Sequence, residues 1–233
     1  MTAVSTEPPR AAAGTRRRGS DLFYRVVVRL ALIAFKLMRW RVVVSGEEHI
    51  PISGPALIAS NHVSFVDFMF LGFAAHPRGR LVRFMALQKA FDHRVSGPMM
   101  RWMKHIPVDR FGDPTPAYDH AIRALRAGEI VGIHPEAKVN VSLEPLPAKS
   151  GAARMVIETG APLIPAAVWG SQRILTPRVK PKFPRGVTIV VRLGAPIGSD
   201  ASTDPAELTD RLMDRIRELV LEAEAWHRAH GAR

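Results

Sequence analysis

A histidine and an aspartate with four residues between them are the side chains in this sequence best suited to general-base chemistry. His62 follows an apolar run, residues 56–59, and the turn-forming pair Ser60-Asn61, and Asp67 comes five positions later. A histidine takes a proton from an alcohol near neutral pH, and it does so best when a carboxylate accepts a hydrogen bond from its other ring nitrogen. The pair therefore predicts a base that activates a hydroxyl group.

This pair requires a break in regular structure between its two members. On one continuous helix, residues five apart point about 140° away from each other and do not meet. We therefore expect His62 on the turn after a strand and Asp67 in the first turn of the next helix, with Ser64-x-x-Asp67 as a capping box. Backbone N–H groups at this helix start are candidates to stabilise an oxyanion. Taken alone, the pair fits a capped helix beside a turn histidine better than a catalytic pair, because short motifs recur by chance, and the other segments reverse this preference.

Apolar runs separated by turn residues predict a single α/β domain over residues 41–233, with a mixed, mostly parallel sheet flanked by helices. The chain has 233 residues and 47% hydrophobic residues, which is enough for one sizeable core. Strands are expected at residues 41–46, 56–59, 80–87, 106–110, 129–134, 162–169 and 187–193. Helices are expected at residues 65–76, 96–104, 115–126 and 150–159, and a last one from residue 205 onward.

The positive charge of the chain is concentrated before this domain. The net charge is +12, and residues 1–41 hold nine Arg or Lys against two acidic residues, a net +7. Residues 1–20 contain little to bury and predict a disordered basic tail rather than a signal peptide.

Residues 21–40 are apolar but too interrupted by charge to span a bilayer, and they predict an interfacial amphipathic helix. Four cations on this helix share a sector about 80° wide and would face anionic headgroups: Arg25, Arg29, Lys36 and Arg39. The alternative is a helix packed on the core with one solvated edge.

Several classes of site are absent from the sequence. There is no cysteine, which excludes disulfides, thiolate metal sites and a cysteine nucleophile. The scattered histidines show no metal-ligand spacing, so no metal site is expected. Aromatic residues make up 7% of the chain and are not interleaved with the basic tail, which argues against nucleic-acid binding by base stacking.

Polar residues also follow two other predicted strands. Asp109-Arg110 ends one strand, and the segment His134-Pro135-Glu136-Ala137-Lys138 follows another. Strand ends at one edge of a sheet converge on one cleft, where a base beside cations suits a hydroxyl substrate that carries phosphate.

In this order and at this spacing, the segments resemble the blocks of the glycerolipid acyltransferase family, whose best-known members are lysophosphatidate acyltransferases. The resemblance covers roughly residues 40–175. Asn61-His62-x4-Asp67 is similar to the first block, in which the histidine is the general base and the aspartate orients it. Residues 106–110, Ile-Pro-Val-Asp-Arg, resemble the second block, whose arginine is associated with the phosphate of the acceptor.

Residues 134–137 resemble the third block, usually Phe-Pro-Glu-Gly-Thr-Arg, and residues 164–167 resemble the fourth, a Pro-containing strand. Residues 149–151 resemble a Lys-x-Gly that many members carry between them. Departures fall on His134, Ala137, Lys138 and Val139 in the third block and on Lys104, which replaces the glycine that opens the second. These departures leave the identity of the acyl acceptor open.

The resemblance implies a glycerol-3-phosphate acyltransferase-like fold and a set of site residues. It implies that His62 and Asp67 are catalytic. It implies the following substrate-binding residues: Asn61, Ser64, Arg110, Pro135, Glu136, Ala137, Lys138 and Lys149.

The implied reaction is direct acyl transfer without a covalent intermediate or a cofactor. Acyl-CoA or acyl-carrier protein is the co-substrate, and a lysophospholipid, in the first place 1-acylglycerol-3-phosphate, is the acceptor. The expected partners are the acyl donor, this acceptor and an anionic bilayer surface, and the expected place is peripheral, at the cytoplasmic face of the cell membrane. The basic loop 174–186 would contact CoA phosphates or headgroups, or be a merely solvated loop.

Alternatives remain open at this point. One alternative is an acyltransferase for a different lyso- or glycolipid acceptor. A second is an acyl-ester hydrolase in which the same two side chains activate water. A third is a non-catalytic basic protein that binds nucleic acid or lipid. The oligomeric state is not indicated.

Overall fold

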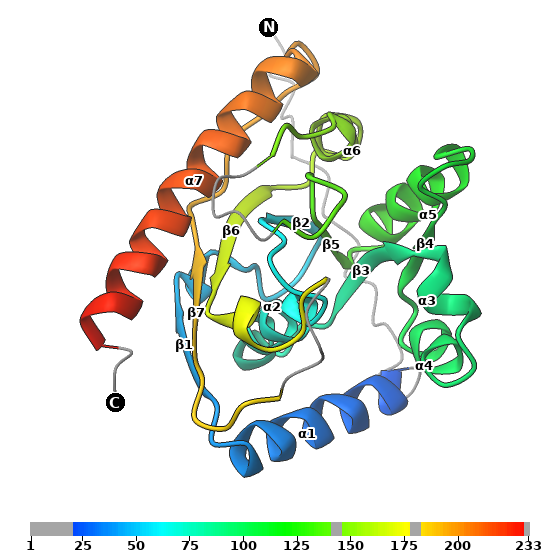
Figure 1. The fold of residues 1–233 in the computed structure, drawn as a ribbon. Helices are drawn as coiled ribbons and strands as arrows, with labels where there is room; N and C mark the ends of the chain where they lie inside the picture. The colour runs from blue at the N-terminus through cyan, green and yellow to red at the C-terminus, as the bar shows by residue number, and fades with distance from the viewer. Residues whose placement is uncertain (1–20, 141–145, 178–182, 231–233) are drawn as a thin grey trace, which may run out of the picture.

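The structure of the chain, a computed structural model, describes residues 21–140, 146–177 and 183–230 (Figure 1). The predicted tail, residues 1–20, lies outside the described residues, as does part of the predicted basic loop, residues 178–182. The strands are β1 (Arg41–Ser45), β2 (Ala56–Ser60), β3 (Val82–Leu87), β4 (Ile106–Val108), β5 (Ile130–Ile133), β6 (Leu163–Trp169) and β7 (Thr188–Leu193). The α-helices are α1 (Leu22–Leu37), α2 (Asp67–Ala75), α3 (Gln88–Asp92), α4 (Ser96–Trp102), α5 (Thr115–Arg126), α6 (Gly151–Thr159) and α7 (Pro205–His230).

The strands form one seven-stranded sheet in the order β1-β7-β6-β2-β5-β3-β4. Every neighbouring pair is parallel except β6 and β7, which are antiparallel. The prediction of a mixed, mostly parallel sheet is therefore confirmed. Because β2 to β6 all run in one direction, their carboxyl ends meet at one edge, where ligands collect in sheets of this kind.

The strand register puts the predicted site segments at that edge. Ala59 of β2 is paired with Ile133 of β5, and Met85 of β3 is paired with Ile106 of β4. Because Phe84 is paired with Gly132, Ile133 and Met85 lie on the same row. The segments that carry His62, His134 and Arg110 therefore leave the sheet at the same level.

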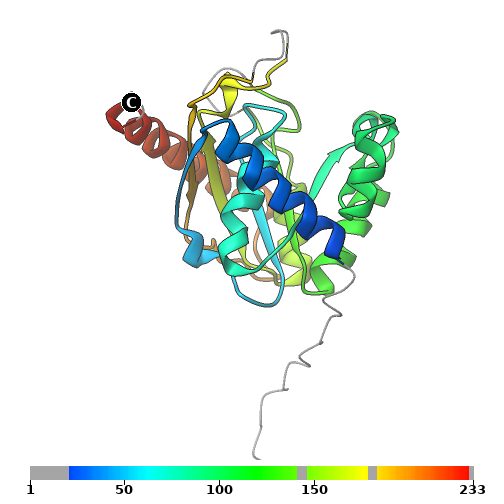
Figure 2. The same ribbon diagram turned by 90° about the horizontal axis from the view of Figure 1, so that it is seen from below.

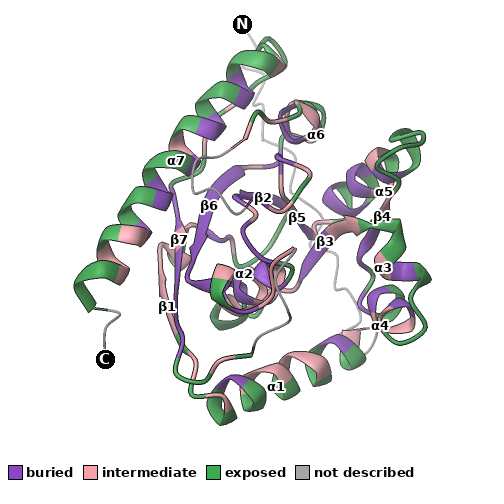
Figure 3. Ribbon diagram, in the orientation of Figure 1, coloured by how far each residue is buried: buried purple, intermediate pink, exposed green. Residues whose placement is uncertain are grey.

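Buried residues of the sheet belong to two cores, one on each face, and the central strands contribute to both. Figure 3 shows these central strands buried along most of their length. Leu57 and Ala59 of β2 point to a core shared with α5, α6 and α7. Ala56 and Ile58 point to the other core, which contains α2 and Phe35 of α1. Both faces are covered, as expected for strands that are hydrophobic along their whole length. Figure 2 shows α1 running across the front of the sheet, with α7 behind it.

Helix α1 packs on the core along one side, as in the second of the two alternatives, and exposes apolar side chains on the other. Tyr24 and Phe35 are buried, the Tyr24 hydroxyl donates a hydrogen bond to the Val82 carbonyl at 2.7 Å, and the Phe35 ring packs on Phe70 at 5.3 Å. The opposite side exposes a stripe of apolar side chains, the α1 stripe: Leu22, Val26, Leu30, Ile33 and Leu37. One side of α1 thus belongs to the core, and the other is free to contact an apolar surface.

The predicted cationic sector of this helix is shorter than expected. The helix ends at Leu37, and Arg39 lies beyond it in the left-handed region with φ 55°. Arg25, Arg29 and Lys36 remain on the helix and are exposed. None of the helices in the described ranges has the length and apolarity needed to cross a membrane.

Candidate active site

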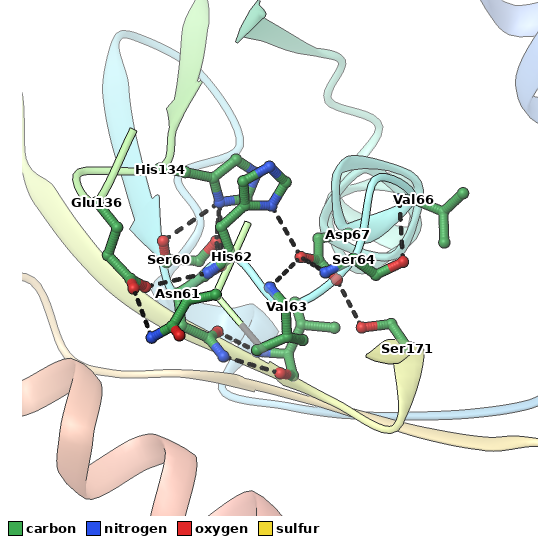
Figure 4. A network of polar contacts seen from close by, with 12 residues as sticks. Ser60, Asn61, His62, Val63, Ser64, Val66, Asp67, His134, Glu136 and Ser171 are labelled. Atoms are coloured by element: carbon green, nitrogen blue, oxygen red, sulfur yellow. Dashed lines mark hydrogen bonds and ion pairs between the residues drawn. The ribbon is translucent and has the colours of Figure 1, made fainter. Parts of the chain in front are cut away.

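His62 and Asp67 meet where β2 ends and α2 begins (Figure 4). Nδ1 of His62 lies 3.0 Å from Oδ2 of Asp67, and the five-residue separation is bridged by a turn, as the sequence requires. A buried carboxylate accepts hydrogen bonds, so Nδ1 carries the proton and Nε2 carries the lone pair. The His62 side chain is 18% exposed, whereas that of Asp67 is fully buried. The geometry gives His62 an oriented ring with an accepting nitrogen on its far side.

Asp67 is held by three further donors. The backbone N–H groups of Val63 and Ser64 each donate to Oδ2 at 2.8 Å, and the Ser171 hydroxyl donates to Oδ1 at 2.5 Å. The carboxylate therefore organises the turn as well as the histidine. Ser171 lies just after β6, and nothing in its sequence context indicated a place in the site.

The predicted capping box is only half formed. Asp67 reaches back to the Ser64 N–H as a capping box requires, but the Ser64 hydroxyl donates to the Leu175 carbonyl at 2.8 Å instead of capping the Asp67 N–H. Ser64 is fully buried and joins the turn to the segment after β6. The Ser64 hydroxyl is therefore engaged in hydrogen bonds within the protein, and the structure does not place it as a substrate-binding group.

The expected oxyanion site at this helix start is contradicted by the hydrogen bonds. The N–H of His62 donates to Glu136, that of Phe65 to the Leu175 carbonyl, and that of Val66 to the Ser64 hydroxyl. The N–H groups of Val63 and Ser64 bind Asp67, so these turn donors are already committed.

Asn61 joins the end of β2 to β6. Its amide accepts a hydrogen bond from the Val168 N–H at 2.8 Å and donates to the Val168 carbonyl at 3.1 Å. The side chain is buried and extends the β2–β6 ladder past Ser60. Asn61 thus fixes the strand end that carries His62.

Glu136 supports the same turn from the other side. Its carboxylate accepts the His62 N–H at 3.2 Å, the Asn140 side-chain amide at 3.2 Å and the Leu146 N–H at 3.0 Å. The Asn140 N–H returns a hydrogen bond to the His62 carbonyl at 2.6 Å. Burial raises the pKa of Glu136 despite these donors. The structure places it as a support of His62, with its carboxylate occupied by protein groups.

The other predicted binding residues of this segment lie around Glu136. The Pro135 carbonyl accepts the Lys149 N–H at 3.2 Å, which brings Lys149 to the third block. Lys138 and Lys149 are exposed. Ala137 has φ 55°, and Lys104 has φ 57°. Both replace family glycines, so the backbone keeps a glycine-like conformation although the glycines are gone.

Arg110 lies at the same sheet edge but follows β4, the edge strand three strands from β2, which ends at Val108 and not at Arg110 as predicted. It is exposed, and its guanidinium lies over the Phe111 ring at 5.7 Å. Asp109 accepts the N–H groups of Phe111 and Gly112, and no ion pair joins it to Arg110 within the described ranges. Arg110 is thus an exposed cation at the edge that carries His62, with no contact to that histidine shown.

His134 is stacked flat on His62, with ring centroids 4.0 Å apart and planes 7° apart (Figure 4). Its Nδ1 lies 3.0 Å from the Asn61 carbonyl, 3.2 Å from the Ser60 carbonyl and 3.0 Å from the Ser60 hydroxyl. Burial, and then the neighbouring His62, lower the pKa of His134 to about 3. The sequence pattern predicts no role for this histidine, although its position in the third block can be seen in the sequence.

A cavity of about 620 Å³ lies away from this cluster. Its lining includes Arg101 and Lys104 beside α4, His120 and Arg123 of α5, and Pro107 of β4, and none of the predicted site residues. No group of three or more His, Asp or Glu side chains able to hold a metal ion occurs in the part of the chain that the structure describes.

Comparisons with known proteins show the family of this chain. The sequence model of a family described as Acyltransferase matches residues 41–169. The chain is 30% identical over 195 residues to a 1-acyl-sn-glycerol-3-phosphate acyltransferase of Bacillus subtilis, covering 81% of this chain and 93% of the relative. It is 27% identical over 209 residues to the human 1-acyl-sn-glycerol-3-phosphate acyltransferase alpha, covering 88% and 71%.

The fold also matches a solved structure. The crystal structure of the 1-acyl-sn-glycerophosphate acyltransferase PlsC from Thermotoga maritima superposes with a TM-score of 0.73 at 21% identity, covering 91% of this chain and 85% of that one. This match confirms the predicted α/β architecture.

Proposed function

This chain belongs to the acyltransferase family, and on that premise we propose that it moves a fatty acyl group from an acyl thioester to a free hydroxyl of a lysophospholipid. As a member of this family, the chain is an O-acyltransferase. The relatives named 1-acyl-sn-glycerol-3-phosphate acyltransferases support 1-acylglycerol-3-phosphate as the acceptor.

The observation that carries the proposal is the hydrogen bond between His62 and Asp67. Because Nδ1 donates to the carboxylate, the Nε2 lone pair accepts the proton of the acceptor hydroxyl. The hydroxyl oxygen then forms a bond to the thioester carbon, and collapse of the tetrahedral adduct breaks the carbon–sulfur bond. The thiolate departs readily because thiols are much more acidic than alcohols, and it takes up the proton held by His62. Asp67 stabilises the imidazolium during this transfer without itself becoming protonated.

Three exposed cations support a phosphate-bearing acceptor at this sheet edge. Arg110 follows β4, and Lys138 and Lys149 flank the segment that contacts His62 through Glu136. We assign Arg110 to the acceptor phosphate because its planar fork binds two phosphate oxygens at once, which a lysine does not do. The donor is acyl-CoA or acyl-carrier protein, and no further cofactor takes part.

We also propose that the α1 stripe rests on an anionic bilayer as a peripheral contact at the cytoplasmic face, where the leaflet is negatively charged. Two further features support this membrane contact. The exposed Trp102 meets the Phe23 ring edge-on at 4.9 Å, and Arg25, Arg29 and Lys36 are exposed on the same helix. A membrane contact brings the site close to the lipid acceptor.

The decisive experiment supplies purified protein with labelled acyl-CoA, and in parallel with labelled acyl-carrier protein, and a panel of lysophospholipids that includes 1-acylglycerol-3-phosphate. We expect a labelled diacyl product that depends on both the thioester and the acceptor, and none with His62→Ala. Label released only as free fatty acid, at a rate independent of acceptor, would show a hydrolase. No turnover of either donor with any acceptor would refute the proposed function.

A further inference from the structure

We propose that His134 is a specificity-determining residue that accepts a hydrogen bond from a second hydroxyl of the acyl acceptor, next to the hydroxyl that His62 deprotonates. The acceptor class is then a lipid with two adjacent free hydroxyls, such as a glycerol or another polyol. This inference rests on the proposed function, because it takes His62 to be the base. It narrows the acceptor class given above, because it makes a lipid with a free 1,2-diol a better acceptor than 1-acylglycerol-3-phosphate, whose glycerol carries a single free hydroxyl.

The surroundings of Nδ1 define the tautomer of His134. The carbonyl oxygens of Ser60 and Asn61 lie 3.2 and 3.0 Å from Nδ1, and carbonyl oxygens only accept hydrogen bonds. Nδ1 therefore carries the proton. The Ser60 hydroxyl, 3.0 Å away, donates to the Asn61 carbonyl at 3.1 Å and does not compete as a donor. In a neutral ring with a protonated Nδ1, Nε2 carries the lone pair.

The ring stays neutral at working pH. Burial lowers the pKa of His134 to about 3, and a charge on the stacked His62 lowers it further. The groups that face the ring are these two carbonyls, the Ser60 hydroxyl and His62, with Asp67 beyond them, and none of them is placed to bind a proton on Nε2. His134 therefore keeps an accepting nitrogen while His62 gains and loses its proton.

Both rings hold the same tautomer and stack face to face, 4.0 Å apart. In each ring Nδ1 is held by a hydrogen bond within the protein, which leaves Nε2 as the nitrogen that can accept one. Figure 4 shows the two rings overlapping and the contacts of the two Nδ1 atoms as dashed lines. Neither Nε2 has a hydrogen-bond partner among the described residues, and neither is one of the fully buried atoms left without a partner. The two hydrogen-bond acceptors therefore belong to neighbouring, stacked rings.

A lone pair in this position selects its ligand. A substrate that covers the Nε2 of His134 removes it from water, and an acceptor atom left unpaired in this way weakens binding. The phenylalanine usual in the family provides the same flat ring without this cost. The lone pair of His134 therefore favours substrate binding only when the substrate supplies a second hydrogen-bond donor. The two hydroxyls of a 1,2-diol are close enough together to contact two stacked rings at once.

The test compares two acceptors that differ at one position, 1-acylglycerol with free 2- and 3-hydroxyls and its 3-O-methyl ether with a single free hydroxyl. Both are supplied in the same detergent micelles with the same acyl thioester. For the wild-type protein we expect kcat/KM to be about tenfold higher for the diol, which corresponds to one recovered hydrogen bond. Equal values for the two acceptors would overturn the proposal, and this comparison needs no variant.

The matched variant is His134→Phe, which keeps an aromatic ring against His62 and removes the lone pair. We expect the diol-to-ether ratio to fall to about one. If the variant lowers kcat/KM equally for both acceptors and keeps the ratio, His134 only holds His62 in place and the proposal is wrong. Circular dichroism and thermal melting report whether the variant is folded. Absence of transfer to every acceptor, including 1-acylglycerol-3-phosphate, would instead refute the proposed function.

Discussion

The hydroxyl of Ser171 donates a hydrogen bond of 2.5 Å to Oδ1 of Asp67, opposite the oxygen that faces His62. Ser171 stands in a short 3-10 helix, η4 (Ser171–Arg173), that follows β6, and its side chain is fully buried. Because one carboxylate oxygen is held by this serine and the other by two backbone N–H groups, the carboxylate has little freedom to turn away from the imidazole. Ser171, Asp67 and His62 therefore form one chain of hydrogen bonds.

Ser171→Ala should lower kcat about tenfold while leaving the acceptor KM nearly unchanged. The reason is that the hydroxyl orients Asp67, which orients the base, and removing one partner of a buried hydrogen bond costs roughly 1–3 kcal/mol. Steady-state kinetics with the preferred acceptor provides the measurement. Ser202→Ala, the same change on an exposed turn, is the control and should leave kcat as in the wild type. A kcat for Ser171→Ala equal to that of this control would remove Ser171 from the site.

His62→Ala and Asp67→Ala should differ in stability although both abolish acyl transfer. Loss of the base should lower kcat by about 10²–10⁴, and the 18% exposed ring of His62 makes its removal tolerable for the fold. Asp67→Ala also leaves the N–H groups of Val63 and Ser64 unpaired, so it should reduce the free energy of unfolding by several kcal/mol. Urea titration beside the activity assay separates the two effects. Full activity in either variant would sink the mechanism.

The pairing of His62 with Asp67 was predictable because it depends on a local turn, five residues long, between a buried strand and an apolar helix. The position of the site at one edge of the sheet was also predictable, because the polar residues of each block follow the end of a strand. The roles of Asn61, Ser64 and Glu136 were not predictable in this way. Each is occupied by partners far along the chain, as when Asn61 binds Val168, and only the packed strands bring these together.

Departures from the family pattern were also harder to interpret than matches. Ala137 and Lys104 look like lost glycines in the sequence, yet both keep a positive φ, so the backbone conformation survives at a cost of roughly 1–2 kcal/mol. His134 looked like a lost phenylalanine, and its tautomer depends on the two carbonyls that receive its proton. Neither result follows from residue type.

The stability of the protein should fall below pH 6.5, partly because of His134. Its folded pKa of about 3 lies below the unfolded value of 6.5, so between these values only the unfolded chain binds the proton. The stabilising contribution is complete above pH 6.5 and is lost as the pH falls toward 3, with a slope of about 1.4 kcal/mol per pH unit. Denaturant midpoints between pH 4 and 6 measure this slope.

His134→Phe should reduce the pH dependence of the free energy of unfolding by the contribution of one proton, about 1.4 kcal/mol per pH unit. A second contribution should remain in the variant, because burial lowers the pKa of His105 to about 3 as well. An unchanged slope in the variant would show that His134 binds its proton in the folded protein as it does in the unfolded chain, contrary to its lowered pKa.

Arg110→Ala should raise the KM for a phosphate-bearing acceptor about tenfold or more, with a smaller effect on the KM for the acyl donor. A charge-assisted hydrogen bond to phosphate contributes about 1.5–3 kcal/mol, and Arg110→Lys should recover only part of it because the bidentate fork is missing. Arg211→Ala, at another exposed arginine, is the control. If the acceptor KM of Arg110→Ala matches that of the control, the phosphate is bound elsewhere.

The membrane contact of the α1 stripe can be tested with single substitutions, whereas deletion of residues 1–40 would also remove Tyr24 and Phe35 from the core. Leu30 on α1 is 60% exposed, and Leu221 on α7 is 64% exposed, so Leu30→Gln and Leu221→Gln make the same change at equally open positions. Burying a leucine in an apolar phase contributes roughly 1.5–3 kcal/mol, so Leu30→Gln should weaken binding to anionic vesicles about tenfold or more.

Co-sedimentation with vesicles of defined anionic lipid content measures that binding, and added salt should weaken it further because Arg25, Arg29 and Lys36 share the helix. Leu221→Gln should bind as the wild type does, since α7 packs on the opposite face of the sheet from α1. Equal vesicle binding by the two variants would mean that α1 does not contact the bilayer. In that case its apolar stripe must be covered by a different surface, and the acceptor lipid must reach His62 from another side of the domain.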